Sequence, residues 1–291
     1  MRRRRFLNAC AMGGSAFALS AAWTRDLDSA RVLRVGTTPV FLDDKIGFLA
    51  RWASYLSPRV GMRVEFVSRR SYRDIMGLLL KDELEAAWIC GFPWVVNQAR
   101  LRGLSIPLYN GKPLYQSYLI VPASDQKTAS LADLAGKVYA FSDPDSNSGY
   151  LVPRTTLIKA GIDPDRHFYR TFYTWGHRNV VTAVADGLAQ GGSVDGYVWD
   201  TLRLVAPSLV ARTRVAWRSE FYGFPPLAVR KTLDGETEAV LHRALLGMGN
   251  DDEGKRLLAE LNLTGFGAFE AQVFDSIARN VALVGNRASV G

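Results

Sequence analysis

The chain has 291 residues, of which 48% are hydrophobic and 22% charged, and its formal net charge is +8 at pH 7. This length fills about two domains, because one core rarely serves more than ~250–300 residues, and the composition excludes a largely disordered chain. After the N-terminus, no apolar run approaches the ~18–20 residues of a membrane span. Four positive charges lie in the first five residues, and no basic stripe alternates with aromatics, so we expect no nucleic-acid partner.

Residues 1–22 have the pattern of an export signal. Four arginines at positions 2–5 precede a mildly apolar stretch at 9–22, and Ser20-Ala21-Ala22 places small residues before a possible cleavage site. The segment Arg3-Arg4-Arg5-Phe6-Leu7 also matches the twin-arginine export pattern. We therefore predict a periplasmic protein with a twin-arginine signal cleaved near Ala22. An ordinary secretory signal and a retained anchor are the alternatives.

Cleavage after Ala22 leaves 269 residues with a net charge of +4, which suits a small anionic ligand. It also removes Cys10, whose position before the apolar stretch disfavours a lipoprotein. Cys90 is then the one thiol of the mature chain, so an intramolecular disulfide is impossible. A lone cysteine of this kind is either buried and inert or functional.

Strands and helices alternate in the first half of the mature chain. Apolar periodicity, caps and glycine stops predict strands at 32–35, 62–67, 84–90, 104–108 and 115–121, and helices at 46–60, 71–80 and 93–103. The strand at 84–90 is too apolar for a one-sided sheet. This order predicts an α/β unit with a parallel sheet covered on both faces.

A second α/β unit follows. We predict helices at 131–136, 148–160 and 178–187, and strands at 137–141, 168–173 and 193–198. Strands at 215–217 and 227–230 then return to the first unit, and the end is helical at 236–248, 253–261 and 271–283. No Pro/Gly/Ser-rich linker separates the units, so we expect strand crossovers between them. A cleft between two such lobes, facing strand C-termini and helix N-termini, is a common ligand site.

The loop Asp143-Pro144-Asp145-Ser146-Asn147-Ser148-Gly149 carries the most chemical information. It follows a strand and opens a helix, where unpaired N–H groups and the helix dipole favour an anion. The hydroxyls of Ser146 and Ser148 and the amide of Asn147 add hydrogen-bond donors for a tetrahedral oxyanion. A plain helix N-cap is the alternative, since Asp, Ser and Asn all serve that role.

At this loop the chain resembles the phosphate, phosphite and phosphonate substrate-binding proteins of ABC transporters. The motif Asp-Pro-x-Ser-x-Ser-Gly-Tyr at 143–150 is followed by Gly161-Ile162-Asp163-Pro164, Gly176-His177 and Val194-Asp195-Gly196-Tyr197, and the likeness covers roughly residues 31–250. It implies a type II periplasmic-binding-protein fold: two α/β lobes, a ligand cleft and two hinge crossings. We expect lobe 1 at 31–120 plus 218–291 and lobe 2 at 121–217.

The resemblance also implies ligand-binding residues. Ser146 and Ser148 match the family's anion loop, and Asn147 stands where a threonine is common. Tyr72 and Tyr115 match tyrosines that reach the oxyanion, and His177 matches a family histidine at a helix start. Asp195 matches an acidic residue that accepts from a protonated oxygen or an amine on the ligand.

Each of these residues also has an ordinary structural role open to it. Tyr72 and Tyr115 are alternatively aromatic residues that pack between the lobes, and His177 is alternatively a helix cap. Asp195 alternatively accepts hydrogen bonds from nearby backbone N–H groups. His167, in a polar turn, and His242, on a helix, are expected to be structural.

The segment Trp88-Ile89-Cys90-Gly91-Phe92-Pro93-Trp94 departs from the family pattern, which has small or hydroxylated residues at this strand end. Three interpretations of Cys90 remain: a buried apolar thiol, a contact to an ordinary oxyanion, or a ligand for a soft oxyanion such as arsenite. Arsenite-sensing binding proteins resemble this family and use a cysteine. Trp94 is placed to narrow the pocket.

Several classes of function lack their motifs. There is no Gly-x-x-x-x-Gly-Lys-Ser/Thr loop, no zinc-spaced Cys/His cluster and no nucleophile elbow, so we expect no ATPase, no metal, no cofactor and no hydrolase. We predict a monomeric protein that is not an enzyme and that captures a phosphonate-, phosphite- or phosphate-type oxyanion for an ABC permease. A sensor that presents its closed form to a sensor kinase is the alternative. An enzyme on the same fold would need a catalytic residue in the cleft, for which only His177 is a candidate.

Overall fold

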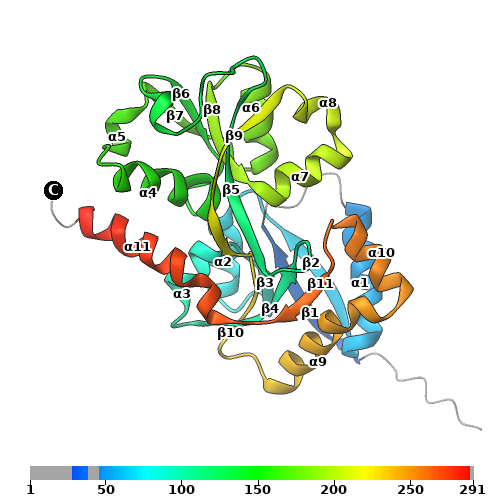
Figure 1. Cartoon of the computed structure of the whole chain (residues 1–291). Helices are drawn as coiled ribbons and strands as arrows, with labels where there is room; N and C mark the ends of the chain where they lie inside the picture. Colours follow the sequence, from blue (N-terminus) through cyan, green and yellow to red (C-terminus); the bar gives the residue numbers. More distant parts are fainter. Residues whose placement is uncertain (1–27, 39–45, 289–291) are drawn as a thin grey trace, which may run out of the picture.

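The computed structural model describes residues 28–38 and 46–288, and the predicted signal segment 1–22 lies outside the described residues (Figure 1). Two β-sheets organise the chain, one of six strands in the order β11-β4-β10-β3-β1-β2 and one of five in the order β7-β6-β8-β5-β9. We call the six-stranded sheet with its helices lobe 1, and the five-stranded sheet with its helices lobe 2. This is the predicted two-lobed α/β architecture.

Lobe 1 is a mixed sheet. Its strands are β1 (Asp28–Thr37), β2 (Met62–Ser68), β3 (Ala86–Trp88), β4 (Leu101–Leu108), β10 (Leu227–Arg230) and β11 (Gly265–Ala268). β1 pairs in parallel with β2 and β3, whereas β10 inserts antiparallel between β3 and β4, and β11 lies antiparallel on β4. The prediction of a wholly parallel sheet was therefore wrong. Strands from the C-terminal part of the chain return to this sheet and run against its first strands.

The helices of lobe 1 follow the predicted periodicity closely. They are α1 (Ile46–Val60), α2 (Tyr72–Leu80), α3 (Gly91–Asn97), α9 (Gly235–Leu246) and α10 (Asp252–Glu260), with a 3₁₀ turn, η3, at Gly247–Asn250. Ser71 caps α2 as predicted, accepting a hydrogen bond from the backbone N–H of Asp74 at 3.1 Å. α3 ends six residues earlier than predicted because β4 already begins at Leu101 and pairs with β10.

Lobe 2 is built from strands β5 (Leu114–Pro122), β6 (Val138–Phe141), β7 (Arg170–Tyr173), β8 (Gly191–Asp195) and β9 (Thr213–Gly223). Its helical elements are η1 (Ala132–Leu134), η2 (Asn147–Leu151), α4 (Val152–Lys159), α5 (Pro164–His167), α6 (His177–Ala185), α7 (Gly196–Val205) and α8 (Pro207–Val210). The predicted strand 193–198 is wrong after Asp195. This residue caps α7 by accepting from the backbone N–H of Tyr197, so the chain turns into a helix there.

The chain passes from lobe 1 to lobe 2 at 109–113 and back at 224–226, between consecutive strands of different sheets. β5 and β9, on which the predicted lobe limits fall, both belong wholly to the second sheet. The predicted division of the chain into lobes at 120/121 and 217/218 stays a prediction. A 3₁₀ turn, η4 (Ala271–Phe274), and the last helix, α11 (Asp275–Ala288), close the chain.

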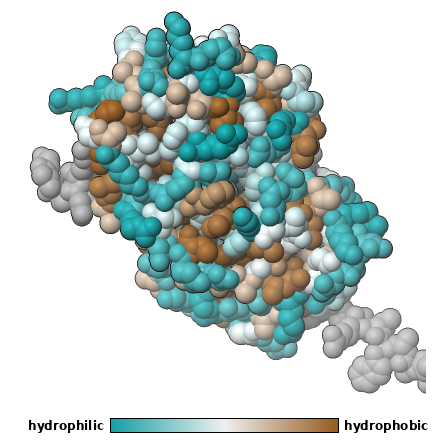
Figure 2. Space-filling view, in the orientation of Figure 1, coloured by the Kyte–Doolittle hydropathy of each residue, from teal (hydrophilic) through white to brown (hydrophobic). Residues whose placement is uncertain are grey.

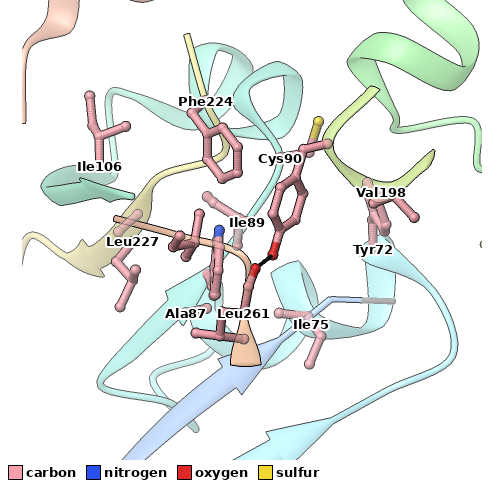
Figure 3. Close-up of a cluster of buried hydrophobic side chains, with 14 of the residues drawn as sticks. Tyr72, Ile75, Ala87, Ile89, Cys90, Ile106, Val198, Phe224, Leu227 and Leu261 are labelled. Atoms are coloured by element: carbon pink, nitrogen blue, oxygen red, sulfur yellow. Dashed lines mark hydrogen bonds between the residues drawn. The ribbon is translucent and has the colours of Figure 1, made fainter. Parts of the chain in front are cut away.

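Apolar packing continues from one lobe into the other. Trp52, Trp88 and Phe266 pack as aromatic rings in lobe 1, with ring centroids 6.2–6.3 Å apart. The same buried cluster includes Val198 of α7 in lobe 2. Figure 3 shows part of it, with Tyr72 and Cys90 among the apolar side chains. No helix of the described residues is long and apolar enough to cross a membrane.

Candidate functional site

The sequence-predicted site residues lie where strands of both lobes end. In lobe 2, β6, β7 and β8 run parallel and lead into the loop of Ser146, the start of α6 at His177 and the cap of α7 at Asp195. In lobe 1, β2 leads to Tyr72 and β3 to Cys90. Because the carboxyl ends of parallel strands meet at one sheet edge, these polar groups converge. The eight predicted residues are each at most 3% exposed: Tyr72, Cys90, Tyr115, Ser146, Asn147, Ser148, His177 and Asp195.

The loop of residues 142–149, which we call the anion loop, is held by contacts within lobe 2. The Ser146 hydroxyl accepts from the backbone N–H of Gly149 at 3.0 Å, and the Ser148 carbonyl accepts from the Ser117 hydroxyl at 2.7 Å. A Cβ on Gly149 would lie 1.9 Å from the Ser142 hydroxyl, so this position requires glycine. The loop opens into one π-helical turn, η2, a form that is frequent at functional sites.

A histidine–tyrosine pair joins the lobes. The backbone N–H of Asp195 donates to Nδ1 of His177 at 3.1 Å, so the neutral ring carries its proton on Nε2. This Nε2 lies 3.2 Å from the Tyr72 hydroxyl. Burial lowers the pKa of His177 to about 3, which keeps the ring neutral. Since Nε2–H donates to the phenol oxygen, the Tyr72 proton is directed to another acceptor.

A second tyrosine is held in the same way. The Asn147 side-chain N–H donates to the Tyr115 hydroxyl oxygen at 2.9 Å, so the phenol proton points to another acceptor, and the Ser148 side chain is also a hydrogen-bond partner of this hydroxyl. Asn147 Oδ1 and the Ser142 hydroxyl are buried without a hydrogen-bond partner among the described residues. Such groups are uncommon in native interiors because each costs desolvation free energy. These two buried polar groups of the anion loop therefore have hydrogen-bonding capacity that the described residues do not use.

Cys90 contacts the anion loop from lobe 1. Its Sγ accepts a hydrogen bond from the backbone N–H of Asn147 at 3.3 Å. Burial raises the pKa of the thiol to about 12, so it is protonated at neutral pH. The Trp94 ring lies 4.9 Å from the rings of both Phe269 and Phe274, so it packs against the C-terminal segment.

Two buried carboxyl groups flank the site. Burial raises the pKa of Asp195 to about 8, although the backbone N–H of Tyr197 donates to it at 2.8 Å. Burial also raises the pKa of Asp143, whose carboxylate accepts from the backbone N–H of Tyr72 at 3.2 Å, across the lobes. Sequence reasoning assigned no role to Asp143. Its place in the Asp-Pro motif was the only available signal.

The site residues carry no guanidinium or ammonium group. Arg73 approaches the anion loop, but it is exposed and pairs with Asp145 at 3.4 Å. No group of three or more His, Cys, Asp or Glu side chains in the described part of the chain could hold a metal ion. The arrangement is therefore a buried set of hydroxyl, imidazole and backbone N–H donors flanked by the carboxyl groups of Asp143 and Asp195, which suits a small anion that carries a proton.

Residues 35–274 match a family model described as ABC transporter, phosphonate, periplasmic substrate-binding protein. The chain belongs to this family. A curated relative, the phosphate-import protein PhnD of Mycolicibacterium smegmatis, is 28% identical over 193 residues, which cover 62% of this chain and 60% of that protein. The chain thus spans less than two thirds of that relative's length. The phosphonates-binding periplasmic protein of Escherichia coli K12 is 25% identical over 228 residues, covering 75% of this chain and 67% of that protein.

Solved structures share the fold. The binding-protein component of an ABC phosphonate transporter from Pseudomonas aeruginosa is 24% identical with a TM-score of 0.78, covering 86% of this chain and 85% of that chain. PhnD1 from Prochlorococcus marinus, solved with methylphosphonate, is 18% identical with a TM-score of 0.79, covering 87% of this chain and 98% of that one. At these identities the likeness concerns the fold, and it agrees with the predicted type II periplasmic-binding-protein architecture.

Proposed function

We propose that this protein is the periplasmic capture component of an ABC importer and binds a small phosphorus oxyanion, with a phosphonate as the preferred class. The observation that carries the proposal is the pair of buried tyrosine hydroxyls. The oxygen of Tyr72 and that of Tyr115 each lie within hydrogen-bond distance of a side-chain N–H donor, His177 and Asn147 respectively. Their protons are therefore directed to an acceptor, and an oxyanion supplies several acceptor oxygens.

The mechanism follows from which lobe holds which donor. An anion first contacts the anion loop of lobe 2, where Ser146 and Ser148 stand at a helix start. Closure then brings Tyr72 of lobe 1 to the anion loop, where its phenol O–H and the Nε2–H of His177, whose heavy atoms lie 3.2 Å apart, both turn to the anion. Closure excludes water, which strengthens these charge-assisted hydrogen bonds.

Asp195 gives the site its preference for a protonated ligand. With a pKa raised to about 8, the carboxyl group keeps its proton at neutral pH and adds no negative charge that would repel an anion. When it is ionised, it accepts a hydrogen bond from a protonated ligand oxygen or from an ammonium group, as in an aminoalkylphosphonate. The ionised state favours a phosphorus oxyanion over sulfate, which carries no proton at neutral pH.

We propose a membrane permease as the partner to which this protein delivers its ligand. Delivery requires that the mature chain is exported, as predicted. The sensor-kinase alternative rested on Cys90 as a ligand for a soft oxyanion. The thiol is buried and protonated and accepts from a backbone N–H, which favours a structural contact over a thiolate ligand.

The test is a thermal-shift and calorimetry panel with phosphate, phosphite, methylphosphonate, 2-aminoethylphosphonate, sulfate and arsenite. A ligand at about 100 times its Kd adds about 2.7 kcal/mol of stability. We expect a phosphonate to raise Tm and the double variant Ser146→Ala/Ser148→Ala to abolish the rise. Ser54→Ala, on the exposed face of α1, is the matched control. A panel without any hit would reject the oxyanion function, and an arsenite hit lost in Cys90→Ser would favour the sensor.

A further inference from the structure

The last helix, α11, touches the site-bearing segments of both lobes. It packs against α3, which follows Cys90, and against η2, which begins at Asn147. It also contacts α4 and β9 of lobe 2. Figure 1 shows α11 running beside the junction of the lobes, from the level of α3 towards α4. The family match ends at residue 274, immediately before α11 begins.

The N-terminal end of this segment is anchored at lobe 1 and at a crossing between the lobes. Phe274 and Ile277 are at most 1% exposed. A Cβ on Gly91, at the start of α3, would lie 2.7 Å from the Ile277 side chain. A Cβ on Gly223, at the end of β9, would lie 2.9 Å from the Phe274 ring. Both glycines therefore permit a close approach that a larger residue would prevent.

The middle of α11 is bound to lobe 2 by a buried asparagine. Asn280 is 1% exposed, and its side-chain N–H donates to the Tyr222 hydroxyl of β9 at 3.2 Å. Its Oδ1 accepts from the Lys159 ammonium at the end of α4 at 3.0 Å. Both the N–H and the oxygen of this buried amide have hydrogen-bond partners. Separating the amide from them costs free energy, because each group would lose its hydrogen bond. Asn280 thus fastens α11 to two elements of lobe 2.

We propose that α11 is a strap that stabilises the closed arrangement of the lobes, with Asn280 as its fastening to lobe 2. Opening of the lobes about the two crossings moves α4 and η2 of lobe 2 away from α3 of lobe 1. Helix α11 contacts both lobes and cannot move with both of them. It must leave either the Gly91 contact or the Asn280 hydrogen bonds. The strap therefore lowers the free energy of the closed arrangement, in which Tyr72 reaches His177 and Cys90 reaches Asn147.

The surface of the molecule and the burial of α11 show which side of this helix is packed. Figure 2 shows hydrophilic side chains over the outer parts of both lobes and apolar side chains gathered towards the middle of this face. Val281 and Val284 of α11 are partly buried against the main core cluster, whereas Ala282 is exposed. The helix thus packs through one side and offers a solvent-facing position for a matched control.

The test measures lobe separation directly. Spin labels are placed on exposed positions of opposite lobes through Lys255→Cys in α10 and Arg166→Cys in α5. The full chain carries Cys10→Ser, and the buried Cys90 stays native. Double electron–electron resonance then compares Asn280→Ala with Ala282→Ser. Tyr222→Phe, which removes only the hydroxyl partner, is a second and milder variant in case Asn280→Ala does not fold.

We expect Asn280→Ala, and more weakly Tyr222→Phe, to add longer interlobe distances, while Ala282→Ser matches the wild type. Unchanged distance distributions in folded Asn280→Ala or Tyr222→Phe would overturn the strap. The effect of the strap on ligand affinity rests on the proposed function, and its probe is methylphosphonate. We expect the Kd of methylphosphonate to rise about tenfold in Asn280→Ala. A wild type that binds no probe would reject the proposed function, and the distance measurement would still decide on the strap.

Discussion

The two lobes contribute to the site in different ways. In lobe 2, the polar residues are held by neighbours of the same lobe: Ser146 by Gly149, Ser148 by Ser117, and His177 by Asp195. In lobe 1, Tyr72 and Cys90 lie at the edge of an aromatic core, and their side chains reach across to His177 and Asn147. Under the proposed function, lobe 2 is therefore a preorganised cradle for the anion, whereas lobe 1 completes the donor set when the lobes meet.

This difference predicts a hierarchy of effects. Changes to the cradle should remove binding, because nothing else supplies its backbone and hydroxyl donors. Changes to the lobe 1 contacts should weaken closure and leave the first encounter with the anion intact. The variants below test this order, from the largest expected effect to the smallest.

Gly149→Ala should abolish measurable binding. The added Cβ would meet the Ser142 hydroxyl at 1.9 Å, so the anion loop must move, and overpacking of this kind costs about 1–3 kcal/mol of stability. Gly77→Ala in α2 of lobe 1 is the control: its Cβ meets nothing within 4 Å and should add about 0.5–1 kcal/mol to the free energy of unfolding. Calorimetric titration with unchanged Kd in Gly149→Ala would contradict the cradle.

Asp195→Asn should flatten the pH dependence of stability. Burial raises the pKa of Asp195 to about 8 from the ordinary value of 3.8. Between these values the folded state holds a proton that the unfolded state has lost, so the free energy of unfolding of the wild type falls as pH rises, by up to about 1.4 kcal/mol per pH unit. Urea titrations from pH 5 to 8 measure the slope. An identical slope in Asp195→Asn would show that this carboxyl group is not the source.

The lowered pKa of His177 acts in the opposite direction, between about pH 3 and 6.5, so it opposes the Asp195 effect there and leaves it alone above pH 6.5. Burial lowers this pKa to about 3, below the ordinary value of 6.5. The unfolded state therefore gains a proton first as the pH falls from 6.5, and stability is lost towards pH 3. His177→Gln should reduce this acid loss, which separates it from the Asp195 effect at higher pH.

Tyr72→Phe should raise Kd about tenfold. The variant keeps the aromatic ring in the core and removes one hydrogen bond to a charged ligand, worth about 1.5 kcal/mol at the lower end of the usual range. The loss should lie mainly in a faster dissociation rate, because Tyr72 acts after the anion has reached the cradle. Stopped-flow kinetics measure this, with the exposed Tyr169→Phe as control. A slower association with unchanged dissociation would place Tyr72 in the encounter step.

Cys90→Ser should have the smallest effect, less than about threefold in Kd. A hydroxyl can accept the backbone N–H of Asn147 as the thiol does, and the thiol is protonated and offers no charge to the ligand. Calorimetry with methylphosphonate and with arsenite tests both interpretations of the cysteine. A loss of more than tenfold for either ligand would show that sulfur contacts it directly.

The sequence by itself predicted the elements whose causes are local. Ser71 caps α2, the anion loop opens a helix, and β5, β6 and β7 lie close to their predicted ranges. Periodicity, caps and glycine stops depend on neighbours a few residues away, so they can be read directly from the chain. The motif around Ser146 and Ser148 likewise predicts an anion site, and this stays a prediction that the binding measurements test.

Tertiary structure decided what depends on distant parts of the chain. β10 inserts antiparallel between β3 and β4, α11 packs against both lobes, and Asn147 donates to a thiol 57 residues earlier. Asp143, which sequence reasoning left without a role, accepts from Tyr72 across the lobes. These contacts follow from strand order and from how the two lobes meet, and neither leaves a periodic signal in the sequence. Burial, which sets the protonation of Asp195 and His177, likewise arises only when the lobes enclose them.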